Sequence, residues 1–269
     1  MKLRAITGFF FIIVMIASNL LGSYVFSGFY LLLSGFCLFE FYKLVREGGM
    51  TASRETGIIN GALFFLVIAA NFYFPAGRFI FLLPVTFSAI FIQELYKKTA
   101  APFTNIAFTF LGIIFAVVPF MFFHAMAFMK GGVDTFNFHI PLAFLIILWS
   151  NDTGAYLVGS KMGKTKLFER HSPKKTYEGL IGGIIISAVA ALILAHFYTE
   201  LTWKQWVTIA ILISCFGTLG DLVESMFKRS INVKDSGGIL PGHGGLLDRF
   251  DGLLMAAPIV YAYLYFISI

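Results

Sequence analysis

The segment SMFKRSINVKDSGGILPGHGGLLDRFD, which runs from Ser225 to Asp251, interrupts two long apolar runs with a dense set of charges. Only 13% of the chain's residues are charged, so this concentration needs an explanation. Cations suit phosphate, carboxylates suit a divalent metal, and a backbone rich in glycine can approach a bulky anion closely. The segment therefore predicts a site for a phosphorylated ligand, held between two helices of a largely apolar fold.

The composition indicates a polytopic membrane protein. Hydrophobic residues make up 58% of the 269 residues, against about 45 to 50% in a typical soluble domain. Apolar runs of about 17 to 25 residues recur along the chain and predict helices, because in lipid each backbone N–H and C=O must be satisfied within its own segment. A β-barrel would alternate polar and apolar positions, which these runs do not. We therefore expect an all-α fold.

Nine membrane spans are expected, within a single membrane domain that covers residues 1–269. Met1 to Leu21 has the basic start and apolar body of a signal peptide, but no small-residue cleavage site follows, so we interpret it as a retained first span. Residues 1–139 would hold five spans, a scaffold and possible dimer region, and residues 140–269 would hold four spans and the catalytic site. The spans are roughly 5–22, 25–43, 57–74, 79–96, 105–128, 140–160, 180–198, 206–226 and 252–269.

The distribution of basic residues predicts the orientation. A formal charge of +6 is also found in proteins that bind nucleic acid, but in a membrane protein the placement of charge matters more than its sum, and we expect no nucleic-acid partner. With nine spans, 17 of the 20 Lys and Arg residues fall on the side of the N-terminus, and the other side holds only Arg78, Lys130 and Lys204. The N-terminus and the charged loops are therefore predicted to face the cytoplasm across the inner (cytoplasmic) membrane, with the C-terminus outside.

Isolated polar residues in the first five spans have ordinary interpretations. Glu40, Glu94 and His124 lie near predicted span ends, where a polar group can reach the membrane interface. Cys37 and Cys215 lie inside apolar runs and are interpreted as small core residues. We expect no chemistry from any of the five.

Two predicted spans carry carboxylates below the membrane surface. Asp152, beside Asn151, would lie roughly 12 Å inside the cytoplasmic edge, where an Asp costs about 2.5 to 3.5 kcal/mol to insert. That cost indicates a cavity, a partner or a metal, although a structural bond between helices would also explain the pair. In the eighth span Asp221, Glu224, Ser225 and Lys228 share one helical face. Glu224 and Lys228 are also spaced as an ordinary helix-stabilising pair.

The loop after the sixth span contains a compact set of phosphate donors. It reads Ser172-Pro173-Lys174-Lys175-Thr176-Tyr177-Glu178-Gly179, with two adjacent lysines flanked by hydroxyls. Such a group suits a triphosphate, although no GxxxxGK[ST] motif is present. Lys161 and Lys166, in the same loop, are better explained by the excess of positive charge on cytoplasmic loops.

The carboxylates predict a magnesium site. Magnesium is commonly held by one or two carboxylates together with substrate phosphates and water. We expect Asp221 and Asp248 to be the main ligands, with Asp251 and Asp152 as the next candidates. A second cation, of unspecified identity, is compatible with three or four carboxylates.

The C-terminal half resembles a known family. The pattern Ser225-x2-Lys228-Arg229-x4-Lys234-Asp235-x-Gly237-x2-Leu240-Pro241-x-His243-Gly244-Gly245-x2-Asp248-Arg249-x-Asp251 is similar to the signature of the phosphatidate cytidylyltransferases, also called CDP-diacylglycerol synthases. Asn151-Asp152-Thr153 and Ser172 to Thr176 resemble upstream blocks of that family. The first 140 residues resemble it only as serial membrane spans.

That resemblance implies a magnesium-dependent transfer of a cytidylyl group from CTP to phosphatidic acid at the bilayer, giving CDP-diacylglycerol and pyrophosphate. It implies that Lys174, Lys175, Lys228 and Arg229 neutralise phosphates. His243 would donate to a phosphoryl oxygen with the backbone of Gly244 and Gly245, unless it is a structural histidine in a turn. The substrate-binding set then includes Asn151, Asp152, Ser172, Lys174, Lys175, Thr176, Glu178, Glu224, Ser225, Lys234, Asp235, Gly244, Gly245 and Arg249.

Two other functions remain open on the sequence. Intramembrane Asp residues and glycine-interrupted helices also mark transport sites, so an anion transporter is one alternative, although no internal repeat is evident. A CTP-dependent enzyme with another acceptor, such as a polyprenol or dolichol kinase or an ether-lipid synthase, is the second. A homodimer through the first five spans is plausible.

Overall fold

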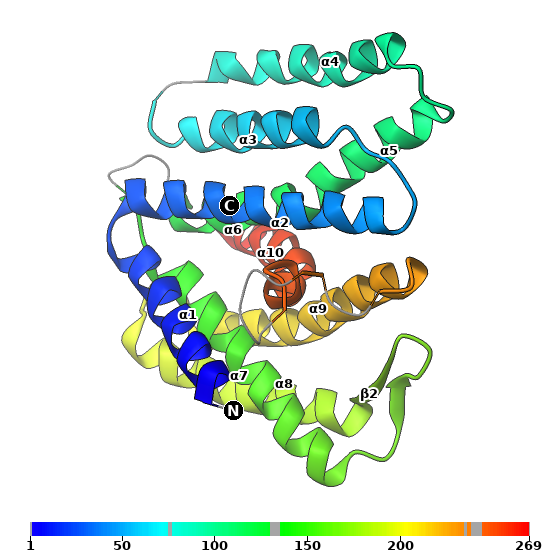
Figure 1. Cartoon of the computed structure of the whole chain (residues 1–269). Helices are drawn as coiled ribbons and strands as arrows, with labels where there is room; N and C mark the ends of the chain where they lie inside the picture. Colours follow the sequence, from blue (N-terminus) through cyan, green and yellow to red (C-terminus); the bar gives the residue numbers. More distant parts are fainter. Residues whose placement is uncertain (1, 75–76, 130–134, 234–235, 238–243, 269) are drawn as a thin grey trace.

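The computed structural model describes residues 2–74, 77–129, 135–233, 236–237 and 244–268. Helices occupy the positions where apolar runs predicted them, and they pack side by side over most of the chain (Figure 1). In the first half the elements are α1 (Lys2–Leu20), α2 (Ser23–Glu47), α3 (Arg54–Ala70), η1 (Gly77–Phe81), α4 (Leu82–Tyr96), α5 (Pro102–Gly112), η2 (Ile113–Val117), α6 (Val118–Ala125) and η3 (Met126–Phe128). In the second half they are α7 (His139–Met162), β1 (Lys166–Phe168), β2 (Ser172–Thr176), α8 (Tyr177–Phe197), α9 (Trp203–Ser230) and α10 (Leu247–Ser268).

Within the described ranges, seven helical segments are long and apolar enough to cross a membrane. The fold is therefore that of a polytopic helical membrane protein. Two of the predicted spans are shorter: the apolar part of α1 is Ile6–Leu20, and α3 has 17 residues. A full crossing needs about 20 apolar residues, so the count of nine spans stays a prediction. The seven are Ser23–Glu47, Gly77–Tyr96, Pro102–Phe128, His139–Met162, Tyr177–Phe197, Trp203–Ser230 and Leu247–Ile267.

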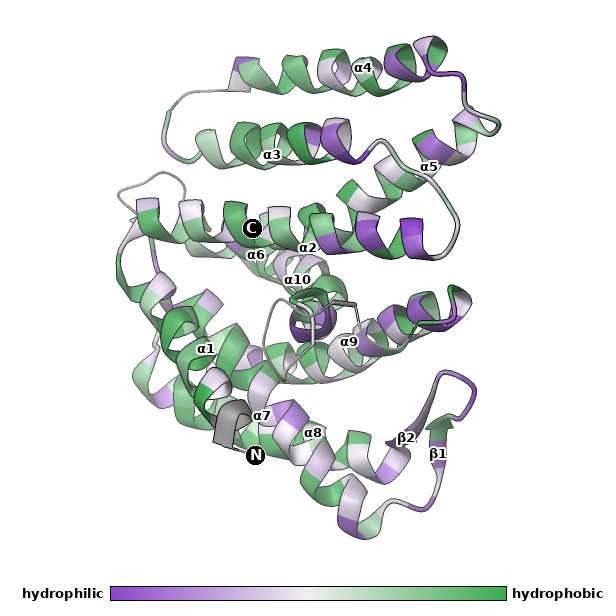
Figure 2. Ribbon diagram, in the orientation of Figure 1, coloured by the Kyte–Doolittle hydropathy of each residue, from purple (hydrophilic) through white to green (hydrophobic). Residues whose placement is uncertain are grey.

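Hydrophilic residues gather at one end of the helices. Figure 2 shows them at the C-terminal ends of α2, α4 and α9, at the start of α3 and along the two strands, whereas the opposite ends are mostly hydrophobic. An apolar body with one strongly polar end is what a membrane protein with charged loops on a single side requires.

The fold is helical, as expected, and the loop between α7 and α8 adds one short strand pair to it. β1 and β2 form an antiparallel pair in which Lys166 lies opposite Thr176 and Phe168 opposite Ser172, with an irregularity between the two positions. Strands this short give too little periodic pattern to identify in a sequence. Thr176 then ends β2 and caps α8, because its Oγ1 accepts the backbone N–H of Gly179 at 3.2 Å.

The interpretation of Glu40, Glu94 and His124 as interface-level groups is wrong. Their exposed fractions are 1%, 4% and 1%, so all three are buried. Each has hydrogen-bond partners, as buried polar groups require. Glu94 accepts from the Ser53 hydroxyl at 2.6 Å, and a ring nitrogen of His124 lies 2.6 Å from the Ser27 hydroxyl.

Close helix packing in the second half positions the acidic residues. On α9, a side chain at Gly220 would collide with the backbone carbonyl of Asp251 on α10, and on α8 a side chain at Gly182 would collide with Val158 on α7. Small residues at helix contacts let backbones approach closely in membrane proteins. As a result α7, α9 and α10 bring carboxylates that are distant in the sequence to one region of the fold.

Candidate active site

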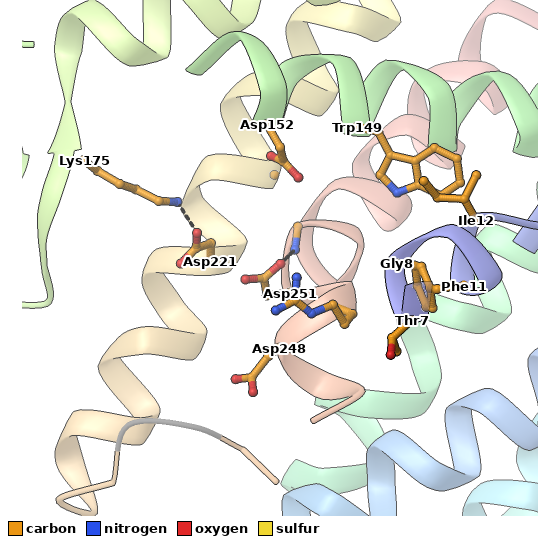
Figure 3. Close-up of a pocket in the computed structure, with 13 residues that line it drawn as sticks. Thr7, Gly8, Phe11, Ile12, Trp149, Asp152, Lys175, Asp221, Asp248 and Asp251 are labelled. Atoms are coloured by element: carbon orange, nitrogen blue, oxygen red, sulfur yellow. Dashed lines mark hydrogen bonds and ion pairs between the residues drawn. The ribbon is translucent and has the colours of Figure 1, made fainter. Parts of the chain in front are cut away.

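Three carboxylates from three helices gather at one cavity. Asp152 projects from α7, Asp221 from α9 and Asp251 from the first turns of α10 (Figure 3). All three line a cavity of about 390 Å³, and Asp248, in the first turn of α10, lines it as well. Figure 3 shows the three side chains in one region of the fold. Like charges around one cavity repel one another, so this arrangement is suited to receive positive charge.

Lys175 supplies part of that charge. It projects from β2, and its Nζ lies 2.6 Å from a carboxylate oxygen of Asp221. The same Nζ is 3.4 Å from the Thr218 carbonyl on α9. The strand pair therefore reaches back to the helices through this lysine. Ser225, one turn beyond Asp221, donates its hydroxyl to Asp221 at 3.2 Å and helps to orient that carboxylate.

A second cavity, of about 570 Å³, adjoins the first. It lies between the strand pair and α7 and α8, and its lining includes Lys166, Lys174 and Lys175. Asp152, Lys175 and Asp221 line both cavities. These three side chains therefore stand where one cavity meets the other. In Figure 3, Lys175 and the α1 residues Thr7 and Phe11 lie on opposite sides of the carboxylates.

Asp248 is held differently from the other carboxylates. One of its oxygens lies 2.6 Å from the Lys228 Nζ, and the other accepts the backbone N–H groups of Ser236 and Gly245 at 3.0 Å. Lys228 in turn pairs with the fully buried Glu224 at 2.6 Å. Asp248 lines the first cavity, but its oxygens already have partners. The contact between Glu224 and Lys228, given above as the structural alternative to a role at the site, is present, and it extends to Asp248.

Glu40 is a residue of this region that the sequence analysis missed. Its carboxylate, on α2, accepts the backbone N–H of Leu247 at 2.8 Å and lies 3.4 Å from the Ser236 hydroxyl. A side chain at Gly245 would collide with it. Glu40 and Asp248 thus hold the described ends of the loop between α9 and α10. The signal in the sequence was a carboxylate between Phe39 and Phe41, inside an apolar run.

Several other predicted residues lie around the site, and one of them, Asn151, lines the second cavity. Glu178 accepts the backbone N–H groups of Lys164 and Thr165 at 3.1 Å and so closes the loop that precedes β1. Arg229 is exposed and donates to the Val233 carbonyl at 3.1 Å, away from both cavities. Asn151 is buried, and its amide lies 3.3 Å from Asp152.

The remaining predicted residues divide between the cavities, the loop ends and parts of the chain that are not described. Arg249 lines the first cavity, and Lys174 and Thr176 line the second. Ser172 begins β2, and Gly244 adopts a positive φ of 83°, which favours glycine. Three of the predictions, Lys234, Asp235 and His243, lie outside the described residues.

The acidic cluster is not a ready-made metal cage. Among the residues that the structure describes, no three His, Cys, Asp or Glu side chains are placed to enclose a metal ion by themselves. Magnesium, however, commonly takes only one or two carboxylates and completes its shell with phosphate oxygens and water. The cluster of Asp152, Asp221 and Asp251 therefore fits magnesium that arrives with a polyphosphate.

Comparison with known proteins relates the whole chain to one family. The sequence profile described as the cytidylyltransferase family matches residues 2–267. A phosphatidate cytidylyltransferase of Bacillus subtilis (strain 168) is 32% identical over 265 residues, which cover 97% of this chain and 96% of that protein. One of Staphylococcus haemolyticus (strain JCSC1435) is 40% identical over 166 residues, and one of Staphylococcus epidermidis is 43% identical over 166 residues. These staphylococcal matches span 61% of this chain and 61% of the relative.

Proposed function

Because this chain belongs to the cytidylyltransferase family, we propose that it transfers the cytidylyl group of CTP to phosphatidic acid, forming CDP-diacylglycerol and pyrophosphate. The observation that carries the proposal is the pair of cavities that meet at Asp152, Lys175 and Asp221. A reaction between two phosphorylated substrates needs two binding spaces that share one charged boundary. Transport of a single solute needs only one.

The two cavities suit the two substrates. The second cavity is lined by Lys166, Lys174 and Lys175, and cations of this kind suit a triphosphate, so we assign CTP to it. The first cavity is bounded by α1 residues and by the carboxylates, and we assign the phosphate of phosphatidic acid to it. The reacting phosphates would then face each other across Asp152, Lys175 and Asp221.

The proposed step is an in-line displacement at phosphorus. An oxygen of the phosphatidate phosphate attacks the α-phosphorus of CTP and forms the new P–O bond. The bond from that phosphorus to the oxygen bridging the α- and β-phosphates breaks, and pyrophosphate leaves with the electron pair. A phosphate monoester has a second pKa of about 6, so the nucleophile is largely a dianion at neutral pH and needs no strong general base. The protein's contribution is then positioning and charge neutralisation.

Lysines from the strand pair would neutralise the phosphates. Lys175 already offsets the charge of Asp221, and an arriving phosphate would share that ammonium group. Lys174 is exposed beside it and lines the nucleotide cavity. Lys228 and Arg229, also predicted to neutralise phosphates, have partners in Asp248, Glu224 and the Val233 carbonyl. Their contacts support a role in holding the loop between α9 and α10.

Magnesium is part of the proposal. Asp221, with Asp152 and Asp251, would hold it, and when bound it offsets the negative charge that builds up on the leaving pyrophosphate. Asp248 as a ligand stays a prediction. Lys228 and the backbone N–H groups of Ser236 and Gly245 hold its carboxylate, although a carboxylate that accepts hydrogen bonds can still bind a metal, and Asp221 also has partners in Lys175 and Ser225. We propose that Asp248 instead fixes the loop around the site.

The orientation in the membrane also remains a proposal. We propose nine spans, with the N-terminus, the strand pair and the active site facing the cytoplasm across the inner membrane, and with the C-terminus outside. The 17-to-3 division of basic residues and the single polar end of the helices support it. We also propose a homodimer through the first five spans, where exposed apolar side chains such as Phe81 and Leu95 suit contact with a second copy or with lipid.

The activity has a direct test. Purified protein in detergent, supplied with CTP, phosphatidic acid and magnesium chloride, should form CDP-diacylglycerol and pyrophosphate in equal amounts. Substituting a polyprenol for phosphatidic acid should abolish the turnover of CTP. Solute flux in liposomes without turnover of CTP would contradict the proposal and favour a transporter.

A further inference from the structure

An apolar groove of about 400 Å³ runs between α1 and α2. Its lining positions are 7, 10, 11, 14 and 15 on α1 and 29, 32, 33 and 36 on α2, each set on one face of its helix. Met15 and Leu33 are buried and form its floor, whereas Phe10, Val14 and Leu32 are exposed at its rim. The groove is therefore closed toward the protein and open on its outer side.

The shape of the α1–α2 pair accounts for the groove. The two helices are joined at Gly22 and tied near that end, where the Asn19 amide donates to the Tyr30 hydroxyl at 3.2 Å. Away from Gly22 they diverge (Figure 1). From Thr7 to Met15 the groove follows α1 for about 12 Å, at 1.5 Å per residue.

The groove adjoins the first cavity of the candidate active site. Thr7 and Phe11 line both spaces and form the boundary between them. Phe11 also contacts Phe250 on α10, with ring centroids 5.8 Å apart. Leu246, which lines the groove, lies two residues before Asp248. The two adjoining spaces therefore form one path along α1, from the acidic cluster past the side chains of Thr7 and Phe11 to the apolar outer surface.

We propose that this groove holds one acyl chain of the lipid substrate while the lipid phosphate lies in the first cavity. This inference rests on the proposed function, since it requires that the acceptor be a diacyl phosphate. The polarity changes along the path as it changes along such a lipid, from charged at Asp221 and Asp251 to apolar at Val14 and Leu32.

The groove would act by positioning. Lipid tails are as apolar as its lining, so an acyl chain gains little hydrophobic free energy on moving into it from the bilayer. A chain held along α1 would instead fix where the phosphate sits relative to the nucleotide, and correct placement of two reactants accelerates their reaction. Bulk lipid or a second copy of the chain are the alternative occupants, but neither requires the connection through Thr7 and Phe11.

Chain-length dependence tests the proposal. Val14→Trp would fill the groove, and Ile13→Trp is the matched control, because Ile13 is similarly exposed on α1 but lines neither the groove nor the first cavity. We expect Val14→Trp to lower kcat/KM by at least about tenfold for phosphatidic acid with long acyl chains. The value for dihexanoyl phosphatidic acid and the KM for CTP should not change, and Ile13→Trp should alter none of these constants.

Equal effects of Val14→Trp on long-chain and short-chain lipid, or no effect on either, would overturn the acyl groove and leave the enzyme activity intact. Absence of CDP-diacylglycerol formation by the unmodified protein would instead overturn the proposed function.

Photolabelling gives a second measurement that does not depend on a variant folding. Phosphatidic acid with a diazirine in the middle of one acyl chain should label peptides containing Phe10, Val14 or Leu32 of the unmodified protein in phosphatidylcholine vesicles. Excess unlabelled phosphatidic acid should suppress this labelling, and excess phosphatidylcholine should not. Labelling that both lipids suppress equally would identify the occupant as bulk lipid and overturn the proposal.

Discussion

The carboxylate of Glu40 accepts the backbone N–H of Leu247 at 2.8 Å, and so joins α2 to the first residue of α10 across 207 positions of sequence. A carboxylate is favourable at a helix N-terminus, where the backbone N–H groups lack partners within the helix. With Asp248, which accepts from the backbone N–H groups of Ser236 and Gly245, it holds described residues of the loop between α9 and α10. The N-terminal half of the chain therefore takes part in building the site.

Removing the Glu40 carboxylate should impair catalysis as well as stability. Glu40→Ala leaves the Leu247 N–H buried without a partner, which costs about 1 to 3 kcal/mol, and it frees the start of α10. We expect at least about a tenfold lower kcat, with Glu40→Gln retaining most of the activity because it keeps an acceptor oxygen.

Glu94→Ala is the control for Glu40, since Glu94 is equally buried but bonds to Ser53, remote from the loop. It should lower the thermal midpoint without a comparable loss of kcat. If Glu40→Ala and Glu94→Ala reduce kcat to the same extent, Glu40 has no special part in positioning the site.

Lys175 should be essential for the chemical step. Replacing it with Met leaves the charge of Asp221 without its partner at 2.6 Å and removes a cation from the boundary of the two cavities. We expect kcat/KM to fall by about a hundredfold or more, as for loss of other groups that stabilise charge in a transition state. Lys161→Met, which removes an exposed lysine outside both cavities, should have little effect.

Lys175 and Asp221 should also act as a unit. The double variant Lys175→Met with Asp221→Asn should lose less activity than the product of the two single losses, because each single change already disables the pair. Steady-state kinetics on the four proteins of the cycle measures this directly. Strictly multiplicative losses would show that the two side chains work independently.

Lys174 should bind the nucleotide and leave the lipid unaffected. It lines only the second of the two cavities, so Lys174→Ala should raise the KM for CTP by about tenfold while the KM for phosphatidic acid changes little. Arg170, exposed between β1 and β2 and outside both cavities, provides the control as Arg170→Ala. A selective rise in the KM for phosphatidic acid would reverse our assignment of the two cavities.

Asp248 and Asp221 should respond differently to magnesium. Asp221→Asn should raise the magnesium concentration needed for half-maximal activity. Asp248→Asn should lower the thermal midpoint and kcat, because it weakens the contact with Lys228 at 2.6 Å, while leaving the magnesium requirement unchanged. A shifted magnesium requirement in Asp248→Asn would restore Asp248 as a ligand.

Much of the fold could be predicted from the sequence, because a membrane helix is encoded locally by about 20 apolar residues. The expected spans 140–160 and 206–226 correspond to α7 (His139–Met162) and α9 (Trp203–Ser230). The strands β1 and β2 were missed, because three and five residues carry too little pattern. Glu40 was misinterpreted, because nothing near it in the sequence shows that Leu247 lies against it.

The residue types of the candidate site could be predicted from the sequence, but the contacts between these residues could not. Asp152 and Asp221 lie below the predicted membrane surface, where inserting a carboxylate costs free energy, and this cost indicated that both residues have a function. The packing of the helices decides which carboxylates share a cavity. An example is the contact of Gly220 with the backbone of Asp251, two residues that are distant in the sequence, so the sequence alone does not show it. That packing brings Asp152, Asp221, Asp248 and Asp251 to one cavity, and it also pairs Asp248 with Lys228.

A structure of the protein with CTP and Mn²⁺ in place of magnesium, with the metal located by anomalous scattering, tests the central claim most directly. We expect the metal at Asp221, with Asp152 or Asp251 as its neighbour, and the triphosphate in the second cavity beside Lys174 and Lys175. A metal bound at Asp248 with Lys228 displaced, or a nucleotide outside the second cavity, would contradict the account.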